Sequence, residues 1–136
     1  MKVYQTKAKK LPGSNYHEVY AAARNYYNEI KKKTKRRPYI RSAYWKKEKV
    51  FFDYLWQHLA QKTPRDRMRR LKFLNCAIEL IKNSRQEPTE LISKNNVHEI
   101  LYRFAGITKD KELFLVQIKE DVKTGAKYFM SCFPEN

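Results

Sequence analysis

Hydrophobic positions in the first part of the chain recur at three- and four-residue steps, the spacing of one face of an α-helix. Ser14 is placed to cap the first of these helices. The segment Thr63-Pro64-Arg65-Asp66 begins another, because it combines a cap residue, a proline at the first helical position and an acid three residues after the cap. An irregular basic arm over residues 1–13 precedes them. The predicted helices cover about residues 15–34, 46–61 and 63–83.

The hydrophobic period changes after a polar segment at residues 86–97. Runs rich in Ile, Leu, Val, Phe and Tyr follow, separated by short turn segments, at about residues 98–107, 112–120 and 126–133. Connections this short make the three strands antiparallel neighbours. We therefore expect an α+β fold in which three N-terminal helices pack on a C-terminal antiparallel β-meander of at least three strands. The basic arm and helical part (1–85), the linker (86–97) and the sheet part (98–136) form one compact domain.

Basic residues are concentrated in the helical part. The 136 residues include 30 Lys and Arg against 14 Asp and Glu, a formal net charge of +16. Residues 1–85 hold 23 of the cations and 6 of the acids, whereas residues 86–136 are close to neutral. A surface of this sign attracts phosphates and releases counterions when it binds nucleic acid, so we expect RNA or another nucleic acid as the partner. The alternatives are an anionic membrane as rival polyanion, and a solvated basic surface with no partner.

The predicted phosphate-binding residues lie in three basic stretches. They end the first helix, connect it to the second and occupy the first two turns of the third. Cations at the end of a helix also complement its dipole, whereas cations in the first turns are mildly unfavourable and would be relieved by an external anion. The predicted nucleic-acid-binding residues are Lys31, Lys32, Lys33, Lys35, Arg36, Arg37, Arg41, Lys46, Lys47, Arg65, Arg67, Arg69 and Arg70.

Several classes of chemistry have no motif in this sequence. It contains no Gly-rich phosphate loop, HExxH, EF-hand, zinc-ligand spacing or nucleophile elbow. We therefore expect no metal and no cofactor. Cys76 and Cys132 lie far apart in apolar segments, as is typical of buried free thiols in a cytoplasmic protein. No apolar run approaches the roughly 18–20 residues that span a bilayer, and the basic N-terminus lacks the apolar stretch of a signal peptide, so we expect no membrane partner.

Polar side chains are set among apolar ones on the three predicted strands. Alternate residues of a strand share a face, so a register with Leu115 opposite Arg103 and Ser131 would gather several of these side chains in one concavity. A slip of one residue in either hairpin would move a member to the other face. The structural alternative is that Arg103 and Lys119 pair with acids on neighbouring strands. This register would gather Arg103, Gln117, Lys119, Lys127 and Ser131, with Phe129 and Phe133 on the face of Ser131.

Such a cluster can cleave RNA without a metal ion. The 2′-hydroxyl beside the scissile phosphate is the nucleophile, so the protein must orient it, stabilise charge on the phosphorane and protonate the leaving 5′-oxygen. Arg103 and Lys119 would supply the positive charge, and Ser131 would donate a hydrogen bond to a phosphate oxygen. An aromatic side chain can stack on an unstacked base, and a His or Tyr can transfer the proton. The candidates are Phe129 and Tyr128 for stacking, Gln117 for RNA contact, and Tyr102, Tyr128 and His98 for proton transfer.

A family resemblance is carried by three C-terminal segments, His98–Gly106, Leu113–Lys119 and Lys127–Pro134. In these segments the chain resembles the barnase–EndoU–colicin–RelE-like ribonuclease superfamily, in its phage- or mobile-element-associated branches. The resemblance implies helices followed by a short antiparallel meander, and metal-independent RNA cleavage of the kind that toxins of toxin–antitoxin systems perform. It supports Arg103, Lys119 and Ser131 as site residues, and a cognate antitoxin or the ribosome as further partners. Many members have a histidine in the active site, where this chain has Tyr102.

Our leading interpretation is therefore a toxin-like endoribonuclease whose basic helices bind the RNA backbone. One alternative is a non-catalytic nucleic-acid-binding protein that uses the same helices. Another is a ribosome-associated or structural protein whose sheet edge pairs with a further chain, a role open to the last strand unless other elements cover it.

Overall fold

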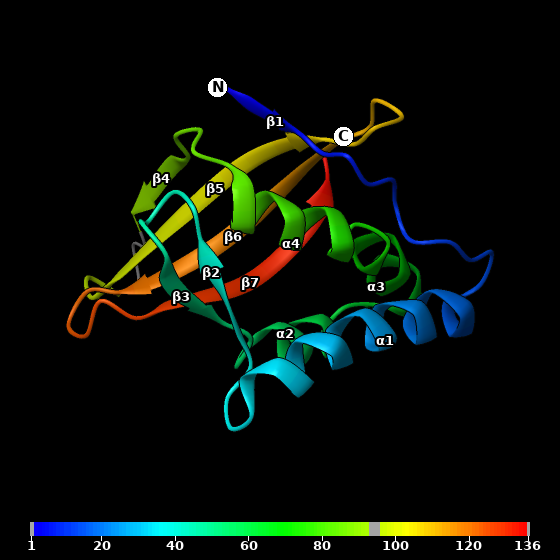
Figure 1. The fold of residues 1–136 in the computed structure, drawn as a ribbon, viewed down its shortest axis with the longest axis horizontal. Coiled ribbons are helices and arrows are strands. Elements are labelled where there is room, and N and C mark those ends of the chain that lie inside the picture. Colours follow the sequence, from blue (N-terminus) through cyan, green and yellow to red (C-terminus); the bar gives the residue numbers. More distant parts are fainter. Residues whose placement is uncertain (1, 93–95, 136) are drawn as a thin grey trace.

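One curved mixed β-sheet organises the fold, and helices from the middle of the chain cover one of its faces (Figure 1). The computed structural model describes residues 2–92 and 96–135. The strand order is β1-β5-β6-β7-β3-β2, and β4 pairs with β5 on the same edge as β1. The elements are β1 (Val3–Gln5), α1 (Tyr16–Thr34), β2 (Tyr39–Ser42), β3 (Glu48–Phe51), α2 (Leu55–Ala60), α3 (Pro64–Leu71), α4 (Leu74–Asn83), β4 (Thr89–Ile92), β5 (Glu99–Ile107), β6 (Leu113–Asp121) and β7 (Lys127–Pro134).

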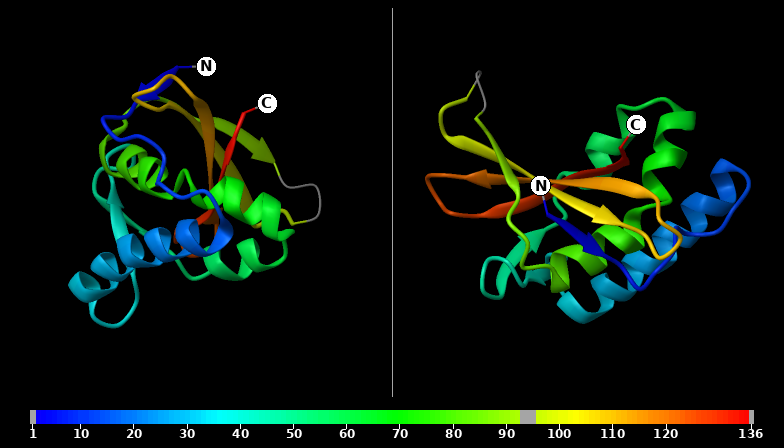
Figure 2. Two further views of the ribbon diagram at one scale, coloured as in Figure 1. Left: turned by 90° about the vertical axis from the view of Figure 1, so that its right-hand side faces the viewer. Right: turned by 90° about the horizontal axis from the view of Figure 1, so that it is seen from above.

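The expected α+β class agrees with this structure, but the expected arrangement is wrong. The sheet has seven strands and forms a half-barrel, where three N-terminal helices on a C-terminal meander were expected (Figure 2). Strands β1, β2, β3 and β4 all come from the part of the chain before residue 98. Two of the pairings, β1 with β5 and β3 with β7, are parallel, so the sheet combines distant segments that no short turn connects.

Residues 39–51 form a β-hairpin where the sequence predicted a connection and the start of a helix. Ile40 and Val50 pair and are buried on the face that packs on the helices, the inner face of the sheet. Arg41 and Lys49 pair on the opposite, outer face and are exposed. A period of two with β-branched and aromatic residues fits a half-buried strand better than a helix, so only Leu55–Ala60 of the predicted second helix is helical.

The predicted third helix is two helices, α3 and α4, that meet at Lys72 and Phe73. The predicted beginning is correct, because the Thr63 side chain accepts a hydrogen bond from the Asp66 backbone nitrogen at 3.2 Å. The break follows from burial, since Leu71, Phe73 and Leu74 are all buried and a single helix would spread them around its surface. In helix α1, by contrast, only the cap residue differs, because Asn15 rather than Ser14 accepts from the Glu18 nitrogen.

The N-terminal arm contributes a strand and is anchored to α4. The Glu79 carboxylate accepts hydrogen bonds from the Tyr4 hydroxyl at 3.0 Å and from the backbone nitrogens of Lys7 at 2.8 Å and Ala8 at 3.1 Å. Burial, together with this bond to Glu79, raises the pKa of Tyr4 to about 12. The predicted linker also contains a strand, β4, and its residues 93–95 lie outside the described part of the chain.

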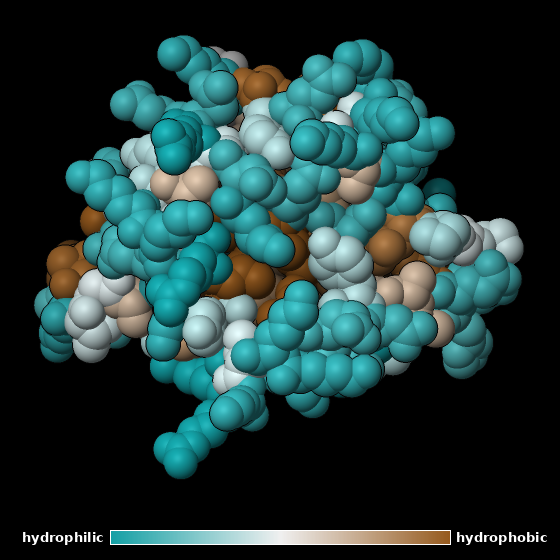
Figure 3. Space-filling model, in the orientation of Figure 1, coloured by the Kyte–Doolittle hydropathy of each residue, from teal (hydrophilic) through white to brown (hydrophobic). Residues whose placement is uncertain are grey.

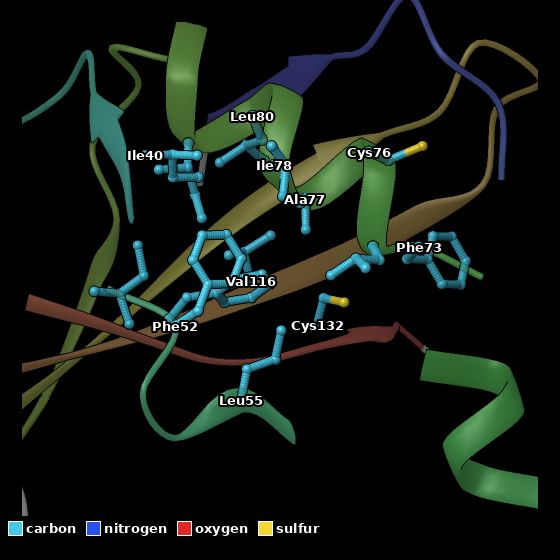
Figure 4. Packing of buried hydrophobic residues seen from close by; sticks show 14 of the residues in the cluster. Ile40, Phe52, Leu55, Phe73, Cys76, Ala77, Ile78, Leu80, Val116 and Cys132 are labelled. Atoms are coloured by element: carbon cyan, nitrogen blue, oxygen red, sulfur yellow. The ribbon is translucent and has the colours of Figure 1, made fainter. Parts of the chain in front are cut away.

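The hydrophobic core fills the space between the helices and the inner face of the sheet, with α4 supplying the largest share of the helical residues (Figure 4). Helix α4 directs Ile78 and Ala77 toward the strands, where Val116 and Cys132 meet them. Both cysteines are free and buried, as predicted. In the described residues no helix has the length and apolar character needed to cross a membrane. The inner face is therefore filled by packing, and chemistry is left to the outer face and to the rims of the sheet.

Candidate active site on the outer face of the sheet

Arg103, Gln117 and Ser131 lie side by side across three adjacent strands on the outer face. Gln117 of β6 is the register partner of Arg103 of β5 and of Ser131 of β7. The Arg103 Nε donates a hydrogen bond to Gln117 Oε1 at 3.2 Å. The predicted register is therefore shifted, because Gln117 and not Leu115 stands between Arg103 and Ser131. The shift of two residues keeps the same face, so these three predicted side chains do converge.

A second guanidinium reaches this row from α3. Arg70 Nη1 donates to the Ser131 hydroxyl at 2.7 Å, and its Nε pairs with Asp66 at 3.1 Å. The guanidinium carbons of Arg70 and Arg103 lie 5.1 and 5.5 Å from the centre of the Phe133 ring. Ser131 itself is only 2% exposed. The predicted direct bond from Ser131 to a phosphate is thus replaced by a bond to Arg70, which Ser131 holds in place beside Arg103.

Lys119 and Tyr128 form the neighbouring row on the same outer face. They are register partners, and Lys119 Nζ lies 4.4 Å from the centre of the Tyr54 ring and 5.8 Å from that of Tyr128. Lys119 also pairs with Glu99 at 3.5 Å, which is the kind of acid that the structural alternative anticipated. A hollow of about 310 Å³ opens here. Its lining includes Lys119, Tyr128, Tyr54, His98, Glu99, Asn96, Asp121 and Lys123.

A β-bulge separates Ser131 from two residues that were expected on its face. The β6–β7 register shifts between Gln117 and Ile118, so Phe129 becomes the partner of Ile118 and points into the core with no exposed surface. Lys127 also lies on the inner face, where it is buried and bonded to Glu48 at 3.2 Å. The structure therefore does not bring Phe129 or Lys127 to the candidate site.

Tyr102, a predicted catalytic residue, lies on the inner face. It is the register partner of Ile118 and is 7% exposed. Its hydroxyl donates to the Glu120 carboxylate at 2.7 Å. Burial and this bond raise the pKa of Tyr102 well above its ordinary value. Tyr102 has no access to a ligand on the outer face, so the proton-transfer candidates there are Tyr128 and His98.

A row of four aromatic rings crosses the outer face beside the candidate catalytic side chains. Ring centres of Tyr39 and Phe51 are 6.2 Å apart, those of Phe51 and Tyr128 are 6.1 Å apart, and those of Tyr128 and Tyr54 are 4.8 Å apart. Cations lie over these rings, with Arg37 3.7 Å from the centre of Phe51. The other cations of the row are Arg41 and Lys49 over Tyr39, and Lys119 over Tyr54. Aromatic rings alternating with cations suit a single strand of nucleic acid, whose bases stack and whose phosphates are anionic.

Sequence reasoning missed Tyr39, Phe51 and Tyr54 as functional candidates. The sequence does indicate a hairpin here. Tyr39 and Arg41 before the loop, and Lys49 and Phe51 after it, are spaced two residues apart, so each pair shares one face of a strand. The predicted helix over residues 46–61 concealed it.

The other predicted phosphate-binding residues are dispersed. Those at the end of α1 are exposed, and hydrophilic side chains cover most of the face seen in Figure 3. In α3, Arg67 turns inward, donating to the Tyr16 hydroxyl at 3.3 Å and the Lys62 carbonyl at 3.0 Å, whereas Arg69 pairs with Asp66. Lys46 and Lys47 form the loop of the β2–β3 hairpin. The exposed residues of the first stretch are Lys31, Lys32, Lys33, Lys35, Arg36 and Arg37, and Arg65 is exposed in α3.

Over residues 2–92 and 96–135, no group of three or more His, Cys, Asp and Glu side chains is placed to hold a metal ion. Comparison of the chain with protein-family models, with curated proteins and with solved structures finds no match. The function is therefore inferred from the geometry of the outer face.

Proposed function

We propose that the chain is an endoribonuclease that binds a single RNA strand across the outer face of the sheet and cleaves it there. The observation that supports this most is the convergence of Arg103, Gln117 and Ser131 in one row, with Arg70 beside them. Side chains from three strands and a helix share this location. Among the described residues, Asp66 is the one carboxylate bonded to this pair of guanidiniums.

The chemistry follows from this charge. The 2′-oxygen attacks the adjacent phosphorus, its proton passes to a base, and the bond from phosphorus to the leaving 5′-oxygen breaks as that oxygen gains a proton. Negative charge collects on the phosphorane oxygens. Arg70 and Arg103 hold fixed positive charge where that charge develops, and in many enzymes fixed charges of this kind contribute more to the rate enhancement than any other effect. Lys119 and Tyr128 lie one row away, and His98 lines the same hollow as both.

The aromatic row is where the bases of the RNA strand would bind. Stacking on aromatic rings is worth about 1–3 kcal/mol per base and accepts every base, because each base has a π-face. A duplex hides these faces, so the outer face is expected to prefer single strands. This observation also favours the second candidate function, a non-catalytic protein that binds single-stranded nucleic acid through the same rings.

An RNA cleavage assay in the presence of EDTA tests the proposal. The pure protein is incubated with labelled single-stranded RNA, and the products are examined for 2′,3′-cyclic phosphate ends. Arg103→Gln and Lys119→Gln are each expected to lower kcat by about 10²–10³, the effect of removing one charge-stabilising group. Lys109→Gln, in the exposed turn between β5 and β6, is the matched control and is expected to cleave normally. RNA binding is measured in parallel with a 2′-O-methyl strand, which lacks the nucleophile.

Two outcomes would contradict the enzyme. Intact RNA with tight binding that is lost in Tyr39→Leu and Tyr54→Leu would leave the binding function alone. Cleavage that survives in both Arg103→Gln and Lys119→Gln would place the chemistry elsewhere or attribute it to a contaminant. Ser131→Ala tests whether Ser131 positions Arg70 or contacts the RNA itself. Loss of the bond to Arg70 is expected to lower kcat, while the affinity for the 2′-O-methyl strand stays the same.

A further inference from the structure

A basic cleft of about 820 Å³ lies between the loop of the β2–β3 hairpin and the C-terminal end of α4. Lys46 and Lys47 line it from the loop, and Lys82 and Arg85 line it from the end of the helix. All four cations are exposed, and among the described residues none of them is in an ion pair. The one acid in the lining is Glu87. The cleft therefore carries a local excess of positive charge that the protein itself does not neutralise.

The loop holds its two lysines in an unfavourable backbone conformation. Lys46 has φ = 52° and Lys47 has φ = 73°, both in the left-handed region. This region costs a residue with a side chain about 1–2 kcal/mol, and Gly, Asn or Asp are preferred there in hairpin loops. The sequence thus keeps two adjacent cations where Gly, Asn or Asp would form the same loop more easily. Lys35 and Lys111 also have a positive φ, so what distinguishes the loop is that two such cations are adjacent and line one cleft.

The walls of the cleft are fixed before any ligand arrives. The Ala43 nitrogen donates to the Ile81 carbonyl at 3.1 Å, which attaches the loop to α4. The Trp45 ring packs edge-on against Tyr102 and Phe104, with ring centres 4.9 and 5.5 Å apart. The Lys47 nitrogen donates to the Ser42 carbonyl at 2.7 Å. Because the loop is anchored on both sides, little conformational entropy remains to be lost when an anion binds.

We infer that this cleft is a second phosphate-binding site, which holds the backbone of the same RNA strand that crosses the outer face. Arg41 connects the two, because it lies on the outer face over Tyr39 and its Nη1 donates to the Lys47 carbonyl at 3.0 Å. A strand that leaves the aromatic row at Tyr39 therefore meets the hairpin loop next. The cleft is too large for one phosphate and offers mostly lysines, which contact phosphates as point charges and carry no base preference. Its role is to lengthen the bound strand, and this inference rests on the proposed function.

Lys82 alone has a simpler explanation, because a cation in the last turn of a helix complements the helix dipole. That explanation does not extend to Lys46 and Lys47, which belong to a hairpin loop.

Binding of short and long strands tests the second site. The probes are 2′-O-methyl single strands of roughly 6 and about 18 nucleotides, lengths that bracket the usual footprint of one small binding surface. The cleft variant carries Lys46→Gln, Lys47→Gln, Lys82→Gln and Arg85→Gln. The control variant loses the same charge at exposed positions elsewhere, through Lys7→Gln, Lys9→Gln, Lys109→Gln and Lys111→Gln. Circular dichroism and thermal melting confirm that each variant is folded.

The cleft variant is expected to bind the long strand about 10²-fold more weakly at physiological salt. The slope of the logarithm of its binding constant against the logarithm of the salt concentration is expected to be shallower by about 2–3. Each phosphate contact contributes about 0.7 to that slope for a single strand. The short strand and the control variant are expected to change by no more than about 3-fold. Equal losses in the cleft and control variants would mean that only net charge matters, and this would overturn the inference. Equal losses for the short and long strands would overturn it as well.

The readout also separates this inference from the proposed function. A protein that does not cleave RNA but shows the length-dependent loss retains the second site and refutes the enzyme. A protein that cleaves RNA and shows no length-dependent loss retains the enzyme and refutes the second site. Absence of any binding to either strand refutes both.

Discussion

Gly106 is the position where one added methyl group should be felt most. It lies in β5, opposite Phe114 of β6 and below Leu80 of α4. A Cβ built on Gly106 would lie 2.7 Å from Phe114 Cε1 and 2.9 Å from Leu80 Cδ1, and closer still to Phe114 Cζ. The Phe114 ring cannot move aside freely, because it is fully buried and stacked on Phe73 with ring centres 5.4 Å apart.

The expected cost of Gly106→Ala follows from two opposing effects. Overpacking of a filled core costs about 1–3 kcal/mol, and two buried rings in contact put this site near the upper end. Alanine also restricts the unfolded chain, which returns about 0.4–1 kcal/mol. The net loss in the free energy of unfolding is therefore about 2 kcal/mol. For a chain of this length that corresponds to a Tm lower by about 8 °C.

Urea denaturation followed by circular dichroism measures this change, and a second substitution tests its cause. Leucine lacks the distal ring atoms of Phe114, so Phe114→Leu makes room for the new methyl group. The double variant is expected to be more stable than the two single losses predict, with a coupling of about 1–2 kcal/mol. A Gly106→Ala protein within about 0.5 kcal/mol of the wild type, or strictly additive losses, would refute this account of the packing between α4 and the sheet.

The remaining predictions concern the arm, a helix cap and pH. Glu79→Ala removes the acceptor of three hydrogen bonds, so trypsin is expected to cut the arm at Lys7 several-fold faster while the core melts nearly as before. Thr63→Ala removes the cap of α3 and is expected to cost about 1 kcal/mol in urea denaturation, whereas Thr63→Ser retains most of it. Burial raises the pKa of Cys76 to about 11 and that of Cys132 to about 12. In the unfolded chain both thiols lose their protons at about pH 8.5, whereas in the folded chain they keep them to higher pH. Their contribution to the free energy of unfolding is therefore fully present below about pH 8.5 and falls above it by up to about 1.4 kcal/mol per pH unit for each thiol, until about pH 11 for Cys76 and about pH 12 for Cys132. Replacing both cysteines with alanine should flatten this slope, and an unchanged slope would assign the alkaline loss to other groups.

Regular elements with a strong local signal were predictable from the sequence. Helix α1 was expected at 15–34 and is found at Tyr16–Thr34, and the last three strands lie within one residue of their expected bounds. The Thr63 cap was likewise predicted with its mechanism. In each case local propensity and the hydrophobic period indicate the same element, so tertiary packing had nothing to override.

The sheet partners of those elements were not predictable. Strands β1 and β4 are short, and each becomes a strand because the free edge of β5 supplies its hydrogen bonds. The β2–β3 hairpin is joined to β7 by a parallel pairing between residues far apart in sequence. Such pairings leave no periodic signal in the sequence, so all strands were expected after residue 97, whereas the structure adds four strands from the part of the chain before it.

The candidate site was predicted only in part: Arg103, Gln117 and Ser131 converge as expected, whereas the bulge in β7 keeps Phe129 and Lys127 on the inner face. Strict alternation places Phe129 and Ser131 on one face, so either the phenyl ring would lie in solvent or the hydroxyl would enter the core without a partner. Burial of a phenylalanine side chain is worth about 1.5–3 kcal/mol, whereas one lost ladder hydrogen bond costs about 1 kcal/mol. The bulge is therefore the lower-energy solution, because it buries Phe129 against Phe52 and leaves the Ser131 hydroxyl free to bond Arg70. Packing of the inner face thus decides which polar side chains reach the outer face, and the proposed site consists of those that this packing does not bury.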